Sequence, residues 1–121
     1  MSQISEAEAV VMEVLWNRHP LGADEVVAAL AQRDWAEPTI KPLLNRLLTK
    51  GAISASRDGR RYLYSPLLQR QAWVAEQSSG LLDKLFAGRV APLVAHFSER
   101  GELSAQDIAE LKKLIQELDH D

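Results

Sequence analysis

Residues 35–65 read WAEPTIKPLLNRLLTKGAISASRDGRRYLYS, and this stretch decides the fold. Its first part places apolar side chains at helical spacing, which predicts an amphipathic helix with one face on a core. The apolar positions are Ile40, Leu43, Leu44, Leu47 and Leu48. Gly51 is expected to end the helix as a left-handed cap. The pattern therefore predicts a helix that is followed directly by a turn at Gly51.

Two short strands are predicted after this helix, at residues 53–57 and 60–65. Asp58 and Gly59 between them signal a tight hairpin, because a type I′ turn needs a positive φ at both central positions. A helix followed by such a hairpin is typical of the recognition helix and wing of a winged helix-turn-helix domain.

The helix face opposite the apolar stripe is polar and basic. Lys41, Asn45 and Arg46 lie on it, and these residue types read base edges, since Arg and Lys donate to guanine and Asn pairs with adenine. A second group, at the end of the helix and at the hairpin tip, is expected mostly to neutralise phosphates. Its members are Lys50, Arg57, Arg60 and Arg61. The stretch therefore carries the side chains of a DNA-binding surface.

A net positive charge is found only in this part of the chain. Residues 38–66 hold six basic side chains and one acidic, whereas the whole chain has a formal net charge of −3. A polyanion would be steered to this face alone. The plainer alternative is a solvated helix face beside a solvated hairpin. The combination of helix, hairpin and segregated charge favours nucleic acid.

Upstream of residue 35, the sequence predicts two further helices. Ser5 and Glu8 have the spacing of a capping box in front of an apolar-periodic run. A second helix is expected at residues 23–33. Three helices followed by two strands predict a winged-helix DNA-binding domain at residues 1–66.

Residues 67–121 form a predicted helical tail, with helical patterns at residues 67–86, at residues 90–97 and after Ser104. A tail of this length has few ways to bury its apolar face alone, so we expect a homodimer in which two tails share one core. The expected interface or tail-core positions are Trp73, Leu81, Leu85, Leu111 and Ile115. The predicted fold is mainly α with a small β-hairpin: a winged helix-turn-helix domain and a helical dimerisation region.

Composition excludes several classes of function. The 121 residues are 46% hydrophobic, and they contain no apolar run near the roughly 20 residues of a membrane span. The first residues lack the pattern of a signal peptide, so we expect a cytoplasmic protein without direct membrane association. The chain has no cysteine, which excludes disulfides and thiolate metal sites.

No metal site, cofactor or enzymatic activity is predicted. The three histidines, His19, His96 and His120, are isolated from one another and from any repeated carboxylate spacing. No nucleophile and base pair, phosphate-binding glycine loop or metal-ligand cluster appears. Surface or core positions are the better interpretation of these histidines, and an enzyme is a distant alternative.

Several different short motifs are spread along nearly the whole chain. They are residues 4–8, Val11, Met12 and Trp16; then Trp35, Thr39, Ile40 and residues 43–47; then Lys50, Gly51 and residues 62–66; and finally Gly88, Leu93, Phe97, Leu103 and Ser104. In order and spacing they resemble the BlaI/MecI/CopY family of bacterial repressors, which control penicillinase, methicillin-resistance and copper-handling operons. Each motif is weak alone, but together they make the resemblance fairly specific.

The resemblance implies a winged helix and a carboxyl-terminal dimerisation region that together bind a palindromic operator in double-stranded DNA. By matching positions, Thr39 joins Lys41, Asn45 and Arg46 at the DNA. These four residues extend the surface that the charge pattern already indicates.

Two departures from the family lie in the recognition helix. Where the family usually has Ser or Thr, this chain has Ala36, so a side-chain cap worth about 1 kcal/mol is missing. Where the family usually has Thr, this chain has Pro42, and an interior proline costs around 3 kcal/mol. We therefore expect the helix to start late or to bend at Pro42, and the operator preference to be altered.

The release step is the part of the resemblance that this chain matches least. In the lactam-responsive branch, a membrane sensor-protease pathway leads to cleavage of an Asn-Phe bond, whose matching positions here are His96 and Phe97. The asparagine is absent, which puts cleavage there in doubt. In the copper branch the family uses Cys-x-Cys motifs, which this chain lacks.

The leading hypothesis is a sequence-specific, homodimeric transcriptional repressor, with an antibiotic-resistance or stress operon as a candidate target. The alternative is a winged helix that serves as a protein-interaction module, whose basic face would meet an acidic partner. Such a module should bind DNA weakly and without sequence preference, which separates the two hypotheses.

Overall fold

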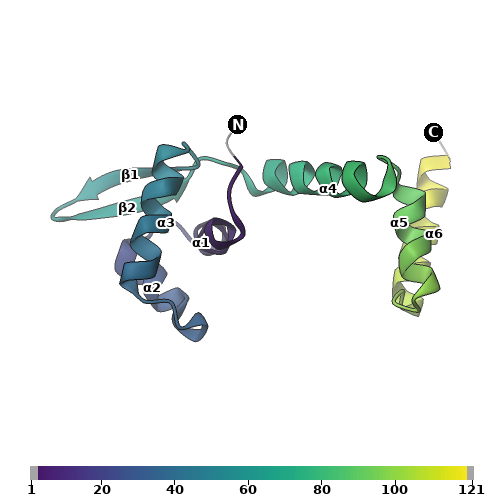
Figure 1. Cartoon of the computed structure of the whole chain (residues 1–121), viewed down its shortest axis with the longest axis horizontal. Helices are drawn as coiled ribbons and strands as arrows, with labels where there is room; N and C mark the ends of the chain where they lie inside the picture. The colour runs from purple at the N-terminus through teal and green to yellow at the C-terminus, as the bar shows by residue number, and fades with distance from the viewer. Residues whose placement is uncertain (1–2, 120–121) are drawn as a thin grey trace. The chain divides into compact units, whose positions relative to one another are not determined.

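The computed structural model describes residues 3–119; His120, considered above as a metal ligand, lies outside them. The described residues form six α-helices, a short 3-10 helix and one antiparallel hairpin (Figure 1). The predicted class, mainly α with a winged helix-turn-helix domain, is confirmed. The chain divides into two compact units, one ending at Val74 and the other beginning at Ala75. The functional division after residue 66 stays a prediction.

Helix α1 (Glu6–Asn17) begins at the predicted capping box. The Glu8 amide donates to Ser5 Oγ at 3.1 Å, and the Ser5 amide donates to Glu8 Oε1 at 2.7 Å. These bonds satisfy two backbone donors that a helix start otherwise leaves free. Met12 and Leu15 on the inner face are fully buried. The capping box thus fixes the start of a helix that supplies part of the core.

Helix α2 (Ala23–Ala29) is shorter than predicted. The Leu30 amide donates to two carbonyls of the preceding turn, at 3.1 and 3.2 Å, so the helix tightens there. The 3-10 helix η1 (Ala31–Arg33) follows, and Asp34 has a left-handed φ of 60°. The single helix predicted over residues 23–33 is therefore an α-helix followed by a 3-10 turn.

Helix α3 (Glu37–Thr49) contains the predicted apolar stripe and the predicted proline. The helix begins five residues before Pro42 and continues through it, so the expectation of a late start is wrong. The side chain of Pro42 is exposed, so its ring does not disturb the core side of the helix. Ala36 is the N-cap residue and supplies no side-chain hydrogen bond, as expected from its methyl group.

Strands β1 (Ile53–Asp58) and β2 (Arg61–Pro66) form the hairpin. Asp58 pairs with Arg61, so the two-residue loop is Gly59-Arg60, one position later than predicted. Of these two residues only Gly59 has a positive φ, 67°. Glycine at the first central position is the pattern of a type II′ turn rather than the predicted type I′ turn.

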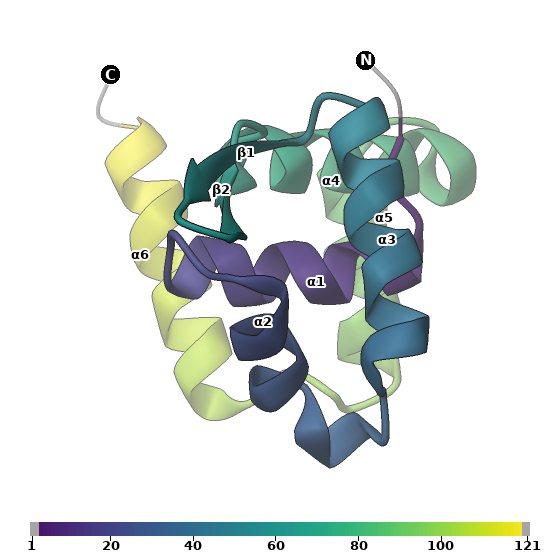
Figure 2. The ribbon, with the colours of Figure 1, turned by 90° about the vertical axis from the view of Figure 1, so that its left-hand side faces the viewer.

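The core of the first unit lies between these elements. Helices α1, α2 and α3 pack against one another, and the hairpin follows directly from α3 (Figure 2). Leu21 forms a backbone bridge to Tyr64 of β2, with N···O distances of 3.1 and 2.8 Å, which ties the α1–α2 connection to the wing. The fully buried side chains include Met12, Leu15, Val26, Ile40, Leu44, Leu47 and Ile53.

Helix α4 (Arg70–Phe86) starts within the first unit and is attached there to α1. The Trp16 indole donates to the Leu68 carbonyl at 2.8 Å, and its ring lies 5.4 Å from that of Trp73, between centroids. Arg70 Nε donates to Glu13 Oε1 at 2.8 Å. Trp73, predicted for the dimer interface or tail core, thus packs on the winged-helix unit.

The second unit contains the rest of α4, helix α5 (Val90–Glu99) and helix α6 (Ala105–Asp119). None of the described residues from Ala75 onward is buried. In the described part of the chain, no helix combines the length and the apolar character needed to span a membrane.

Candidate nucleic-acid interface

Helix α3 keeps its apolar and polar residues on separate faces. Ile40, Leu44 and Leu47 are at most 1% exposed. The residues predicted to reach the bases lie on the solvent side and are all exposed: Thr39, Lys41, Asn45 and Arg46. Because the core holds one face, the opposite face is presented rigidly, which is the requirement for a recognition helix.

Lys41 is paired along the helix with Glu37, one turn earlier, at 2.9 Å. The carboxylate raises the pKa of Lys41 and keeps the ammonium charged. The two side chains are 59% and 61% exposed, so water screens the pair and stabilises either partner once they separate. A phosphate or a base edge could therefore replace Glu37 at little cost.

The wing carries the predicted arginines on its exposed strands and loop. Arg57 lies over the Tyr62 ring at 5.5 Å and donates to the Gly59 carbonyl at 3.3 Å. Arg60 is in the two-residue loop and is exposed. These contacts hold Arg57 along the hairpin, and they leave positive charge at the tip where a wing approaches the DNA backbone.

Arg61 connects the wing to α2 through an ion pair with Glu25. Glu25 also accepts a hydrogen bond from the Gly22 amide at the start of α2. The Gly22 amide and the Arg61 guanidinium together lower the pKa of Glu25. The Glu25 side chain is 37% exposed, so it remains hydrated if Arg61 turns toward a phosphate.

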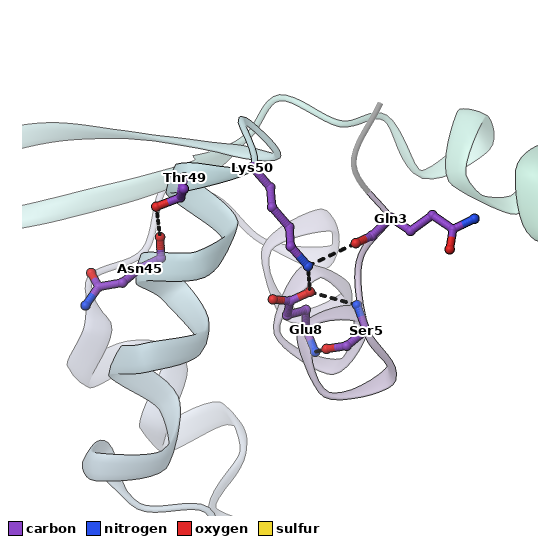
Figure 3. A network of polar contacts seen from close by, with 6 residues as sticks. All are labelled: Gln3, Ser5, Glu8, Asn45, Thr49 and Lys50. Atoms are coloured by element: carbon purple, nitrogen blue, oxygen red, sulfur yellow. Dashed lines mark hydrogen bonds and ion pairs between the residues drawn. The ribbon is translucent and has the colours of Figure 1, made fainter.

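Lys50 differs from the other predicted cations because its carboxylate partner, Glu8 of α1, is buried (Figure 3). Its Nζ donates to Glu8 Oε1 at 2.6 Å and to the Gln3 carbonyl at 2.9 Å. Glu8 is 1% exposed and Lys50 is 28% exposed. Burial raises the pKa of Glu8, but hydrogen bonds from Lys50 and Ser5 outweigh that effect, so the net pKa is lowered.

Burial makes the Lys50 pair far harder to break than the pairs of Lys41 and Arg61. Removing one partner of a buried ion pair typically costs about 3 to 5 kcal/mol, because the other charge is left without water or a counter-charge. The predicted phosphate contact of Lys50 is not tested by this geometry, but it would have to overcome that cost.

The predicted interface positions of the second unit are open to solvent or line a groove. Leu81 and Leu85 of α4 are 45% and 60% exposed, and Ile115 of α6 is 57% exposed. Leu111 lines a groove of about 360 Å³ together with Leu93 and Phe97 of α5. Apolar side chains left this open are available to a partner.

His96 and Phe97, the candidate cleavage position, lie inside α5. The His96 ring is 6.1 Å from Phe86 and 5.4 Å from Phe97, between centroids. A protease needs an extended peptide, so cleavage at this bond would first require α5 to unwind locally. The described residues contain no group of three or more potential ligands placed to hold a metal ion.

The sequence analysis did not predict the ion pairs that three carboxylates form with the predicted DNA-binding cations. These carboxylates are Glu8, Glu25 and Glu37. Glu37 could have been found, since it precedes Lys41 by four residues, the spacing of a helical ion pair. Glu8 was recognised only as a cap, and its pairing with Lys50, 42 residues away, follows from tertiary packing.

Comparison with known proteins agrees with this geometry. A family model described as penicillinase repressor matches residues 4–117. The penicillinase repressor of Bacillus licheniformis is 32% identical over 116 residues, which cover 95% of this chain and 91% of that protein. The methicillin resistance regulatory protein MecI of Mammaliicoccus sciuri is 31% identical over 114 residues, covering 93% of each chain.

Two solved structures resemble the winged-helix part. The DNA-binding domain of the repressor BlaI is 36% identical with a TM-score of 0.52, covering 56% of this chain and 84% of that one. The monomeric form of Bacillus licheniformis BlaI, solved with the blaP half-operator, is 35% identical with a TM-score of 0.51. That match covers 58% of this chain and 87% of the BlaI chain.

Proposed function

This chain belongs to the penicillinase repressor family, and on that premise we propose that it is a DNA-binding transcriptional repressor that occupies a palindromic operator as a homodimer. One observation carries the proposal. The exposed basic face of α3 and the wing stands on the same fold as a BlaI domain that was solved with half-operator DNA.

Within this interface, the residues divide by task. Asn45, Arg46 and Lys41 read base edges, with Thr39 beside them on the exposed face. Arg57, Arg60 and Arg61 neutralise phosphates from the wing. Lys41 and Arg61 exchange their exposed carboxylate partners for DNA, which their solvated ion pairs permit.

The second unit supplies the dimer. From Ala75 onward, its helices expose apolar side chains, and none of the described residues is buried. An exposed apolar surface of this kind marks a site of protein association. A second copy offers the same surface and completes both cores at once. Residues 67–121 act as the dimerisation region, and residues 1–66 act as the DNA-binding domain.

Release from DNA would involve the candidate cleavage position in α5. If a membrane sensor-protease pathway acts on it, cleavage at His96-Phe97 follows local unwinding of α5, because the bond lies within that helix. The helix would then protect the bond in the DNA-bound dimer.

Selection of bound duplexes from a random DNA library, followed by affinity measurements against salt, tests the function. We expect an enriched palindrome with half-sites about one helical turn apart. Weak, steeply salt-dependent binding without enrichment would contradict the repressor and favour a protein-interaction module.

A further inference from the structure

The ion pair of Glu8 and Lys50 connects the start of α1 to the end of α3, the helix proposed to read DNA. Glu8 belongs to the first turn of α1, and Lys50 directly follows the last residue of α3 (Figure 3). Asn45 and Arg46, the proposed base readers, lie about one turn before Lys50 on the same helix. A contact at this end of α3 therefore acts on the orientation of the residues that face DNA.

Each member of the pair also binds a backbone group of the chain before α1. Glu8 Oε1 accepts hydrogen bonds from Lys50 Nζ at 2.6 Å and from the Ser5 amide at 2.7 Å. Lys50 Nζ also donates to the Gln3 carbonyl at 2.9 Å. The ammonium thus joins three features: the chain before α1, the capping box of α1 and the end of α3.

The other paired cations of the interface lack this constraint. The carboxylates of Glu37 and Glu25 are 61% and 37% exposed, so water solvates them when Lys41 or Arg61 moves to DNA. The carboxylate of Glu8 is 1% exposed. If Lys50 moved to a phosphate, Glu8 would be left charged without access to water, which strongly opposes the movement.

We propose that Glu8 and Lys50 are a positioning pair, in which Lys50 stays on Glu8 when DNA binds and holds α3 at the angle needed for base reading. The proposal rests on the repressor function and deepens it. It assigns Lys50 a task different from the phosphate contact expected from the sequence. It also gives the α1 capping box a part in sequence choice.

A neutral double variant, Glu8→Gln/Lys50→Met, tests the proposal in the full-length protein. The glutamine side chain retains an oxygen for the Ser5 amide, and the loss of both charges leaves no uncompensated ion and no change in net charge. The matched control is Glu13→Gln/Arg70→Met, which removes an ion pair between α1 and α4 without touching α3. Arg60→Gln serves as the reference for a lost phosphate contact.

Two quantities are measured for each variant: the ratio of affinities for the selected and a scrambled duplex, and the slope of log affinity against log salt. We expect the double variant to lower the specificity ratio by about tenfold, the effect of one misplaced base contact. Its salt slope should equal that of the parent. Arg60→Gln should lower the slope by about one and keep the ratio, and the control should change neither.

Two results of these binding measurements would overturn the proposal. A salt slope that falls by about one in the double variant would show that Lys50 neutralises a phosphate in the complex. An unchanged specificity ratio with an unchanged slope would show that the pair only stabilises the fold.

A measurement without DNA separates this proposal from the repressor function itself. Residual dipolar couplings in the free full-length protein report the angle between α1 and α3. We expect the double variant to change this angle and the control to leave it alone, and an unchanged angle would overturn the positioning role. If the parent protein prefers no duplex, the repressor function fails, while this angle still decides whether the pair positions α3.

Discussion

The two units of this chain differ most in what they bury. Up to Val74, thirteen apolar side chains of the described residues form a closed core, and Val11, Met12, Leu15, Val26, Ile40 and Leu47 are fully inaccessible. From Ala75 onward, none of the described residues is buried. The first unit completes its core from one chain, whereas the second leaves apolar helical faces open.

This difference in burial indicates which unit is suited to reading DNA and which to forming the dimer. A closed core holds α3 rigid and lets its outer face carry polar groups for DNA. The open faces of the second unit require another surface, and a second copy is the surface that symmetry provides. The most exposed of their apolar side chains are Leu85, Val90, Leu114, Ile115 and Leu118.

The largest expected effect is on the closed core. Leu44→Ala removes a side chain that is 1% exposed and should cost about 2 to 5 kcal/mol in the free energy of unfolding. Leu118→Ala, at a position 74% exposed in the single chain, is the matched control and should cost far less at a protein concentration too low for dimers to form. Chemical denaturation of both variants measures the difference, and equal losses would break the contrast between the units.

The next effect is on assembly. Ile115→Asp places a carboxylate on the exposed apolar face of α6 and should weaken the dimer by about 2 kcal/mol or more, as for a central interface residue. Sedimentation should then show monomers at concentrations where the parent is dimeric, with α-helical content of the winged-helix unit retained. A parent that sediments as a monomer would contradict the proposed role of the second unit.

Changes on the outer face of α3 should affect DNA binding and leave folding intact. Arg46→Ala should cost about 1 to 3 kcal/mol on the selected duplex and relax sequence choice there. Arg60→Ala should weaken all duplexes together and lower the salt slope by about one. A wing variant that changed sequence choice at a constant slope would break this division of tasks.

Restoring the missing N-cap of α3 should raise the stability of the first unit. Ala36→Ser gives α3 a side-chain acceptor for the Thr39 amide, which in the parent donates to the Ala36 carbonyl at 2.9 Å, and should raise the free energy of unfolding by about 1 kcal/mol. Thermal denaturation measures this, and a variant no more stable than the parent would show that the α3 start is already satisfied in another way.

The smallest expected effect is a pH dependence from Glu8. Its folded-state pKa is lowered, so its contribution to stability is complete above the unfolded value of 4.5 and is lost as pH falls through the folded pKa. The stability difference between the parent and Glu8→Gln should therefore shrink as the pH is lowered below 4.5. A difference that stays constant from about pH 6 to about pH 3 would contradict the lowered pKa.

Local sequence signals predicted much of the first unit. The helical spacing of Ile40, Leu44 and Leu47 identified the buried face of α3, and Ser5 with Glu8 identified the start of α1. These features follow from neighbours within one or two turns. The position of the hairpin loop was missed by one residue, because Asp58 pairs with Arg61 and does not take a central position of the turn.

The rest depends on packing between distant parts of the chain. The spacing of Lys50 on the polar side of α3 indicated a phosphate contact, and only the tertiary structure brings Glu8 to it. Trp73 has the pattern of a tail residue, yet it lies against Trp16 of α1. Neither contact has a signal in the local sequence, since the partners are far apart along the chain.

The stoichiometry of the full-length protein on its selected duplex tests the central claim most directly, because it engages both units at once. Sedimentation of the complex should give two chains per palindrome, and a duplex with one half-site scrambled should bind much more weakly. One chain per palindrome, bound as tightly as to a single half-site, would contradict a repressor whose second unit joins two DNA-reading domains.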